Sequence, residues 1–211
     1  TVYSVNPGVE TNQFKMRGEN IDWEHPTVLF VGRFIPAKNL TELLTAFRDI
    51  RSRHPDAQLV LIGEGKMEME LKNMRESLDL ADAVQFPGYV PNAELPKYYR
   101  GADVFTLSSV RENCPIVLLE ALACGTPIVA SDVGYISELL TDGREGILYE
   151  QGNSDVLADA ICRLLEETEL AAEMGQRGSE MVHGMFSWET QADRLYDIFQ
   201  DVILRTGGDL N

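Results

Sequence analysis

Short aliphatic segments alternate with helical segments along most of the chain, and this alternation limits the fold more than any other feature. Six segments are predicted as strands, at residues 27–32, 58–62, 83–86, 104–107, 128–130 and 146–149. Segments between and after them have helical patterns, at residues 39–54, 67–78, 93–100, 115–124, 136–140, 153–167, 169–183 and 188–204. Strands that are apolar throughout and separated by helices form a parallel sheet covered on both faces. The sequence therefore predicts an α/β fold with a doubly wound parallel sheet of about six strands.

The two ends of the chain differ from this regular body. Residues 1–26 contain Pro7-Gly8 and few periodic apolar positions, and they are predicted to be a lead-in. Residues 27–204 carry the alternating pattern and are predicted to form one domain. Residues 205–211 include Gly207-Gly208 and are predicted to form a flexible tail.

Two helix starts carry recognisable caps. Asn39 is followed three residues later by Glu42, which is the spacing of a capping box. Ser187 precedes the last helical segment and is predicted to be its N-cap. Both residues should accept hydrogen bonds from the first backbone N–H groups of their helices.

The charge and the cysteines exclude several classes of protein. The formal net charge is −16, from 18 basic and 34 acidic residues, which argues against a nucleic-acid partner but is compatible with one local basic pocket. Cys114, Cys124 and Cys162 have no metal-ligand spacing and are predicted to be reduced thiols. No apolar run approaches a membrane span of about 18 residues, and no signal peptide is recognisable. We expect a cytoplasmic protein and, because the chain starts at Thr1, a fragment or processed product.

In a doubly wound sheet, ligands bind at the carboxyl ends of the strands, so the residues after each strand are the first candidates for a site. Gly32, Arg33 and Lys38 follow the first predicted strand. A cation such as Lys38 beside a helix N-terminus opposes the helix dipole unless an anion lies between them, and a diphosphate is such an anion. The alternative is that Arg33 and Lys38 are solvated surface charges.

The turns after the second and third strands carry weaker signals. Gly63 and Gly65 permit the close approach of a ligand, but they serve any tight turn as well. Tyr89 and Val90 lie in a Pro-bounded loop, where the tyrosine either approaches a base or packs with its hydroxyl in water.

The helical segment at residues 115–124 is apolar on every side except at Glu120. Such a helix is buried, and a buried carboxylate needs partners. Backbone N–H groups, Arg111 or a ligand diol are the alternatives for Glu120. Glu112 lies just before the helix, where further ligand hydroxyls would be within reach. The N–H groups of Cys114 and Ile116 would face an anion at the same helix start.

The sequence contains no motif for a catalytic histidine, a metal site or a nucleophilic serine. His25, His54 and His183 do not follow strands and are interpreted as non-catalytic. No Asp-x-Asp pair or His-carboxylate cluster indicates a metal site. Ser108 and Ser109 lack the glycines and partners of a nucleophilic serine.

Together these motifs resemble the C-terminal, donor-binding half of the retaining glycosyltransferases of family 4, also called glycosyl transferases group 1. The resemblance runs from about Val5 to Leu204. It rests on the following segments: Val5-Asn6-Pro7-Gly8-Val9-Glu10 with Phe14, Gly32-Arg33 with Lys38, the E-x7-E pair Glu112 and Glu120, Gly125-Thr126-Pro127-Ile128-Val129-Ala130-Ser131, and Phe186-Ser187-Trp188.

The resemblance implies a Rossmann-like domain that forms one half of a GT-B enzyme, with residues 1–26 as interdomain linker and lead-in and residues 27–204 as the nucleotide-sugar-binding domain. Its donor would be a UDP- or GDP-hexose. The hexosyl group would be transferred with retention to a glycan, lipid or small-molecule acceptor held by an N-terminal domain. No metal or other cofactor would be required.

The resemblance also implies roles for individual residues. Arg33 and Lys38 would neutralise the leaving diphosphate, Glu112 would contact the transferred sugar, and these three are the expected catalytic residues. Glu120 would bind the ribose hydroxyls. The other expected donor contacts are Gly32, Gly63, Tyr89, Val90, Asn113, Cys114, Pro115 and Ile116.

The sequence departs from the family pattern at a few positions. Asn113-Cys114 stands where Gly-Phe is frequent, Tyr135 where a second glycine is common, and Ser137 where proline is common. These departures leave the sugar open. The alternatives are a GT-B nucleotide-sugar epimerase or hydrolase, a non-catalytic nucleotide-binding module and a nicotinamide oxidoreductase, which would need a third glycine in the first turn. The domain alone should bind donor weakly and transfer little. Membrane docking of the full-length enzyme and the oligomeric state stay open.

Overall fold

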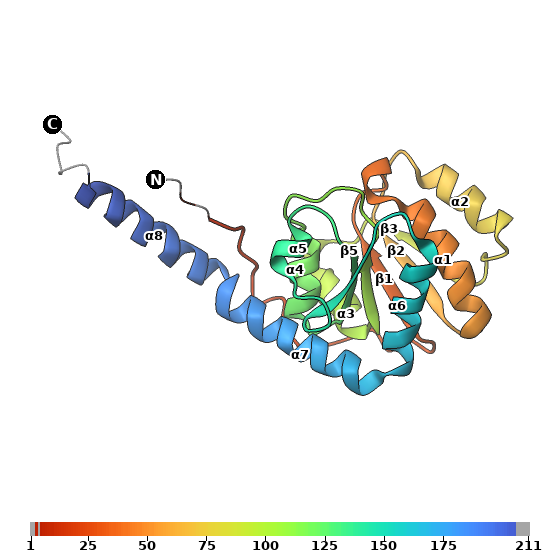
Figure 1. Ribbon diagram of the computed structural model, residues 1–211. Helices are drawn as coiled ribbons and strands as arrows, with labels where there is room; N and C mark the ends of the chain where they lie inside the picture. The colour runs from red at the N-terminus through yellow and green to blue at the C-terminus, as the bar shows by residue number, and fades with distance from the viewer. Residues whose placement is uncertain (1–2, 4, 206–211) are drawn as a thin grey trace.

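The computed structural model describes residue 3 and residues 5–205. Six parallel strands form one sheet in the order β3-β2-β1-β4-β5-β6 (Figure 1). They are β1 (Thr27–Val31), β2 (Gln58–Ile62), β3 (Val84–Gly88), β4 (Val104–Leu107), β5 (Ile128–Ser131) and β6 (Gly146–Tyr149). The predicted doubly wound sheet of six strands is confirmed.

The direction of winding reverses between β1 and β4. The chain proceeds outward from β1 through β2 to β3, and then crosses back to place β4 on the other side of β1. Leu29 at the centre of β1 is in register with Val60 of β2 and with Phe105 of β4. The carboxyl edge of the sheet at β1 and β4 is therefore the switch point at which a ligand crevice is expected.

Helices cover both faces of the sheet (Figure 1). On one face α1 (Leu40–Arg53) packs against α2 (Glu68–Ser77) and α6 (Ser154–Glu166). On the other face α4 (Ile116–Ala123) packs against α3 (Leu95–Gly101) and α7 (Thr168–Met185). The shorter elements are the 3-10 turns η1 (Pro36–Lys38) and η2 (Asn92–Glu94) and the single turn α5 (Ile136–Leu139).

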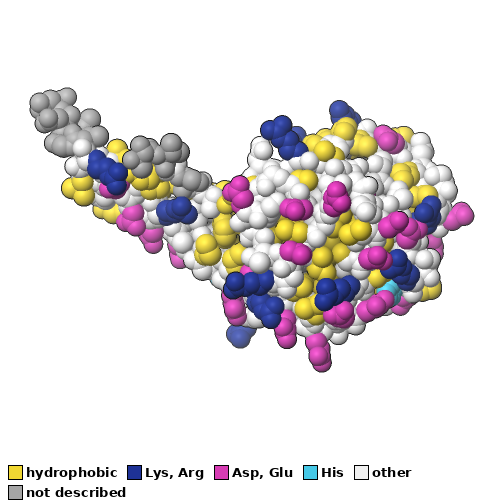
Figure 2. All heavy atoms as spheres, in the orientation of Figure 1, with side chains coloured by type: hydrophobic (Ala, Val, Ile, Leu, Met, Phe, Trp, Pro, Cys, Tyr) yellow, Lys and Arg dark blue, Asp and Glu magenta, His cyan; other side chains and the backbone are white. Residues whose placement is uncertain are grey.

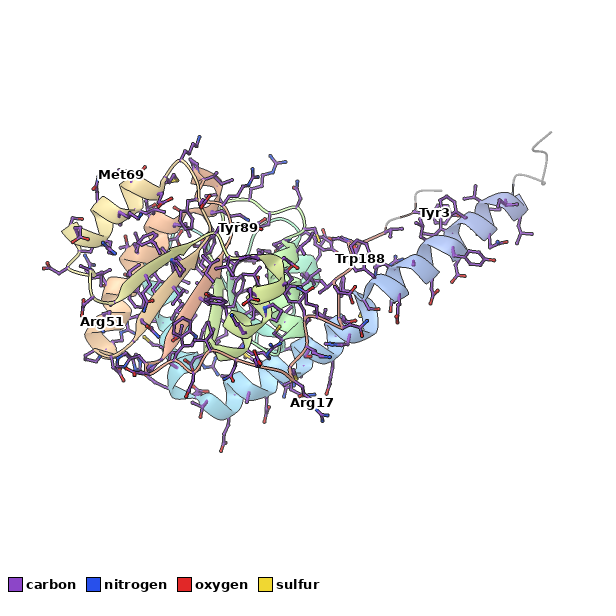
Figure 3. The ribbon with its side chains drawn as sticks, turned by 180° about the vertical axis from the view of Figure 1, so that it is seen from behind. Tyr3, Arg17, Arg51, Met69, Tyr89 and Trp188 are labelled. Atoms are coloured by element: carbon purple, nitrogen blue, oxygen red, sulfur yellow. The ribbon has the colours of Figure 1, made fainter. Side chains whose placement is uncertain are left out.

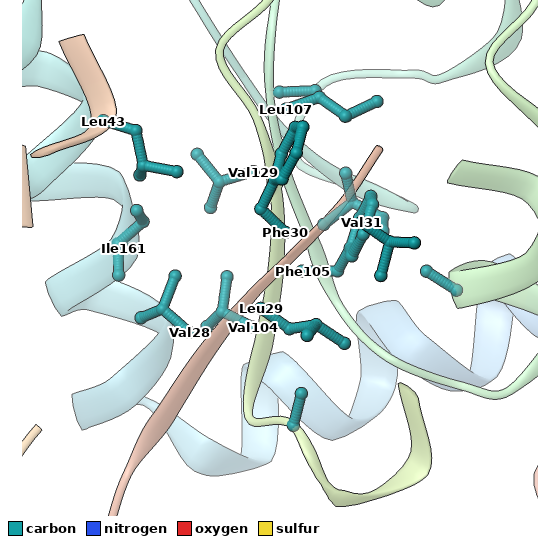
Figure 4. Packing of buried hydrophobic residues seen from close by; sticks show 14 of the residues in the cluster. Val28, Leu29, Phe30, Val31, Leu43, Val104, Phe105, Leu107, Val129 and Ile161 are labelled. Atoms are coloured by element: carbon teal, nitrogen blue, oxygen red, sulfur yellow. The ribbon is translucent and has the colours of Figure 1, made fainter. Parts of the chain in front are cut away.

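The four inner strands are largely apolar on both sides because helices cover both sides. Every residue of β1, β2, β4 and β5 is buried. In β1, Val28 lies on the side of Ile161 of α6, and Leu29 on the opposite side (Figure 4). This double burial explains why the strands read as continuous apolar runs rather than as alternating patterns.

The capping box predicted at Asn39 is wrong, whereas the cap predicted at Ser187 is confirmed. Asn39 ends η1 in the left-handed conformation (φ 49°), and its N–H donates to Pro36. Its side chain donates to the Glu42 carboxylate, so it does not cap a helix N–H. A residue that caps a helix with its side chain typically has an extended backbone. Asn39 has a left-handed backbone instead, because it also ends the 3-10 turn before α1. Ser187 Oγ accepts from the N–H of Thr190 at 3.0 Å.

The last helix, α8 (Trp188–Arg205), extends away from the sheet (Figure 1). Val9 forms a bridge with Ser187, and the N–H of Asn6 donates to Gln191 at 3.1 Å, which joins the lead-in to the start of α8. Figure 2 shows hydrophobic side chains at the surface of α8. Arg205, placed by the sequence in the tail, ends α8, and residues 206–211 lie outside the described part of the chain.

The three cysteines Cys114, Cys124 and Cys162 are free thiols, as predicted. Burial raises the pKa of the Cys124 thiol to about 12. No helix in residues 5–205 is both long enough and apolar enough to cross a bilayer.

Candidate functional site

A cavity of about 530 Å³ lies at the carboxyl edge of the sheet, where the chain leaves β1, β2 and β3 and enters α4. This volume is within the range of small-molecule sites. The cavity includes seven of the expected contact residues: Gly32, Arg33, Gly63, Tyr89, Val90, Ile116 and Glu120. Its other lining residues are Val31, Ile62, Glu64, Asn92, Leu95 and Val117. The structure thus brings together side chains that are as far apart in sequence as Arg33 and Glu120.

Glycines let the turns after the first three strands meet backbone to backbone. The N–H of Gly32 donates to Ile62 at 2.9 Å, and the N–H of Gly63 donates to Gly88 at 2.9 Å. A Cβ on Gly63 would lie 1.9 Å from the carbonyl oxygen of Gly32. Gly63 is therefore required by the neighbouring turn, and this close packing shapes one wall of the cavity.

Glu120 is 6% exposed and receives two hydrogen bonds from neutral donors. The phenol of Tyr99 donates to Oε2 at 3.0 Å, and the Asn92 amide donates to Oε1 at 3.2 Å. Burial raises the pKa of the Glu120 carboxyl, and the two hydrogen bonds counteract part of that effect. Neither donor carries charge, and each carboxylate oxygen keeps a free lone pair for a ligand hydroxyl.

The partners that the sequence offered for Glu120 were backbone N–H groups, Arg111 or a ligand diol. The protein instead supplies Asn92 and Tyr99. Asn92 follows β3 and lines the cavity, so its position after a strand was a usable signal. Tyr99 lies inside α3, and no local pattern shows that its hydroxyl reaches Glu120.

Lys38 and Glu112 do not line the cavity, and they form an ion pair with each other. Ser109 Oγ donates to the same oxygen of Glu112 at 2.5 Å. The backbone joins the two loops as well, because the N–H of Val110 donates to Ala37 at 2.9 Å. The loops after β1 and β4 thus adjoin at the switch point, and the charge of Lys38 is balanced within the protein.

Three more expected contacts, Asn113, Cys114 and Pro115, also lie outside the lining of the cavity. Pro115 precedes α4 in an extended conformation (ψ 98°), so the helix begins at Ile116, one residue later than the proline was predicted to start it. Ile116 lines the cavity and is 45% exposed. Gly125, the residue after the C-cap of α4, adopts the left-handed conformation (φ 80°) with which helices commonly end.

Arg33 is the cation at the cavity. Its guanidinium has no hydrogen-bond or ion-pair partner within residues 5–205. The other charged side chains that line the cavity are Glu64 and Glu120. In a chain with 34 acidic and 18 basic residues, an unpaired arginine at a cavity is available for an external anion.

Tyr89 stands at the edge of the cavity with 70% of its surface exposed (Figure 3). An exposed ring at a cavity offers a flat apolar face for a planar ligand. Among the described residues, no group of three or more His, Cys, Asp or Glu side chains is placed to hold a metal ion.

Comparison with known proteins identifies the family. Residues 11–181 match the model of the family described as glycosyl transferases group 1. The chain belongs to this family. The resemblance seen in the sequence motifs is thereby confirmed, and the fold of this glycosyl transferase domain is that of one half of a GT-B enzyme.

A related sequence is the GDP-mannose-dependent alpha-(1-6)-phosphatidylinositol monomannoside mannosyltransferase of Mycobacterium tuberculosis, which is 32% identical over 92% of this chain and 54% of its own length. Sucrose-phosphate synthase from Thermosynechococcus elongatus superposes with a TM-score of 0.86 at 28% identity, covering 95% of this chain and 52% of its own. Anabaena HepE in complex with UDP-glucose has the same fold, with a TM-score of 0.86 at 23% identity, over 93% of this chain and 57% of its own. The group 1 domain thus spans about half the length of these relatives.

Proposed function

We propose that this chain is the donor-binding half of a glycosyltransferase, and that its cavity binds a UDP- or GDP-hexose. The observation that carries the proposal is the placement of unpaired Arg33 and buried Glu120 in one cavity at the switch point of the sheet. A cation for a diphosphate and a carboxylate for a diol are the two groups that a nucleoside-diphosphate sugar requires. The names of the mycobacterial mannosyltransferase and of the HepE complex support this class of donor.

The residues around the cavity suggest how each part of the donor is held. Glu120 accepts hydrogen bonds from the ribose hydroxyls through its free lone pairs. Arg33 binds the diphosphate, and Tyr89 with Val90 lies beside the base.

The ion pair of Lys38 and Glu112 lies at the adjoining loops, where the transferred sugar and the leaving phosphate would meet. As the bond between sugar and oxygen breaks, negative charge grows on the phosphate, and a cation already in place stabilises it. Lys38, which Glu112 holds at these loops, is the second cation that we propose for this role, beside Arg33. The same loop carries Asn113, Cys114 and Pro115, which we propose contact the sugar side of the donor. With Arg33 and Lys38 in these roles, the reaction requires no metal or other cofactor.

We further propose that transfer proceeds with retention, to an acceptor held by an N-terminal half that residues 1–26 link to this domain. A glycan, a lipid or a small molecule would serve as the acceptor. The chain alone would then bind the donor and transfer little. A cytoplasmic location agrees with the three free thiols.

Calorimetric titration of the chain with GDP and UDP tests the proposal. Binding of at least one of them is expected, together with weaker binding of the matching 2′,3′-dideoxy nucleotide. Glu120→Ala should remove the preference for the ribonucleotide, and Lys38→Ala should weaken binding of the diphosphate. NADH serves as the control for an oxidoreductase. Binding of NADH, together with no binding of GDP or UDP, would contradict the proposal.

Two alternatives, a GT-B hydrolase and an epimerase, are separable by product analysis. A GT-B hydrolase would release free hexose from the donor with water as the sole acceptor, and an epimerase would return a different nucleotide sugar. The proposed transferase should leave the donor intact under these conditions.

A further inference from the structure

A glutamine of the lead-in contacts the site from outside the cavity. Gln13 Nε2 donates at 2.8 Å to the backbone oxygen of Asn92 and at 2.8 Å to Asn92 Oδ1. The two residues are 79 positions apart in the sequence. Gln13 is held in a turn, because its N–H donates to Glu10 at 3.1 Å and the N–H of Phe14 donates to the same oxygen at 2.8 Å.

This contact decides which way the Asn92 amide faces. A primary amide has a carbonyl on one side and an NH2 group on the other, and a carboxylate only accepts hydrogen bonds. With Gln13 donating to Oδ1, the NH2 group faces Glu120 and donates to it at 3.2 Å. The reversed amide would place Oδ1 against the carboxylate and NH2 against the NH2 of Gln13, and both contacts would be repulsive.

The next residue of the lead-in supports the second donor to Glu120. The Phe14 ring is buried and meets the Tyr99 ring edge to face, with centroids 6.0 Å apart and planes at 60°. Tyr99 donates to Glu120 at 3.0 Å. Two consecutive residues, Gln13 and Phe14, therefore contact the two side chains that hold the Glu120 carboxylate.

We propose that Gln13 is a positioning residue for nucleotide recognition: it orients Asn92, and through Asn92 it sets how Glu120 meets the ribose. The inference rests on the proposed function, because it assigns Glu120 to the ribose. Its consequence is that the ribose preference of the site depends on how residues 10–14 are seated. The lead-in then acts on the donor site as well as connecting it to another domain.

The test compares the parent chain with Gln13→Ala, Gln13→Lys and the control Asn12→Ala. Asn12 lies in the same turn, and its backbone N–H, not its side chain, makes the contact with Glu10. The quantity measured by calorimetry is the ratio of dissociation constants for the 2′,3′-dideoxy nucleotide and the ribonucleotide, with GDP or UDP as the probe. Because Asn92 is exposed and water replaces part of the lost contact, Gln13→Ala should lower this ratio by about two- to tenfold. Gln13→Lys keeps a donor and should restore the ratio, and Asn12→Ala should leave it unchanged.

Two further measurements separate positioning from a loss of fold. In an Asn92→Ala background, Gln13→Ala should change the ratio no further, because the two residues act in series. In ¹⁵N spectra without nucleotide, the side-chain NH2 signals of Asn92 should shift in Gln13→Ala and stay in place in Asn12→Ala.

The outcomes are distinct. If the parent prefers the ribonucleotide and Gln13→Ala keeps the full ratio, the inference is overturned and the proposed function stands. An equal loss of affinity for both nucleotides in Gln13→Ala would show a purely structural role and would overturn it too. If the parent binds neither GDP nor UDP, the proposed function fails and the inference fails with it.

Discussion

The phenol of Tyr99 donates a 3.0 Å hydrogen bond to Glu120 from a position that has no exposure to solvent. The Tyr99 ring is held between Phe14 and Phe105, with centroid distances of 6.0 and 5.6 Å. Its backbone oxygen also accepts from Thr126 Oγ1 at 2.7 Å. Packing on both sides of the ring thus fixes the donor, and the donor fixes one oxygen of the carboxylate at the cavity.

Tyr99→Phe keeps the ring and removes this donor. The Glu120 carboxylate then loses a donor that reaches it from the buried side, and we expect a loss of about 1–3 kcal/mol in the free energy of unfolding. Urea denaturation followed by circular dichroism measures it. Tyr98→Phe is the matched control, because the Tyr98 hydroxyl makes no side-chain hydrogen bond in residues 5–205, and it should change stability by no more than about 0.5 kcal/mol. Equal effects of the two substitutions would contradict the role of the Tyr99 hydroxyl.

Burial of Glu120 predicts a pH dependence of stability. Desolvation raises the pKa of this carboxyl in the folded chain, so the unfolded chain releases the proton at lower pH than the folded chain does. The contribution of Glu120 therefore becomes less favourable as pH rises from the ordinary carboxyl pKa toward the raised one. Glu120→Gln removes the titration, and its stability relative to the parent should be greater at pH 7 than at pH 4. Urea denaturation at pH 4 and pH 7 measures the difference in unfolding free energy between Glu120→Gln and the parent. The same difference at both pH values would refute the prediction.

Arg33→Ala tests the anion-binding role of the unpaired guanidinium. The side chain is exposed and has no partner within residues 5–205, so the thermal midpoint should change little. Affinity for GDP or UDP should fall by about tenfold, because a charge-assisted hydrogen bond to phosphate is lost. Arg163→Ala removes one positive charge from α6, away from the cavity lining, and should leave affinity unchanged. A similar loss in both variants would indicate a general charge effect.

Gly134→Ala tests the packing that holds the loop of Glu112. Gly134 has φ 56°, and an added Cβ would lie 2.1 Å from the carbonyl oxygen of Glu112. Gly143 has a similar backbone (φ 75°) but open space around it. Gly143→Ala should therefore lower the free energy of unfolding by only about 1–2 kcal/mol. Gly134→Ala should cost about 1–3 kcal/mol more, because the backbone must move as well. Chemical denaturation measures both changes. Equal losses of unfolding free energy in Gly134→Ala and Gly143→Ala would show that the loop of Glu112 moves away from the added Cβ without loss of stability.

Most of the fold was predictable from local patterns. Strand β4, for example, was placed at Val104–Leu107 with its observed bounds, because a short buried run between helical segments has few alternatives. The absence of a side-chain cap at Asn39 was not predictable from the sequence. The 3-10 turn at Pro36–Lys38 ends with Asn39 in the left-handed conformation just before α1. This turn contacts the loop after β4, where the N–H of Val110 donates to Ala37, and no pattern within residues 36–42 indicates that contact.

The candidate site, like the fold, was predictable from the sequence only in part. The sequence by itself determined that Arg33, Tyr89 and Glu120 belong to one edge of the molecule, since residues after parallel strands, and at the start of the helices that follow them, gather there. Only the tertiary structure decided that Glu120 is held by Asn92 and Tyr99, and that Gln13 sets the Asn92 amide. Periodicity reports which face of an element is buried. Hydrogen bonds between distant side chains depend on ångström-scale distances that arise only when helices, turns and lead-in pack together.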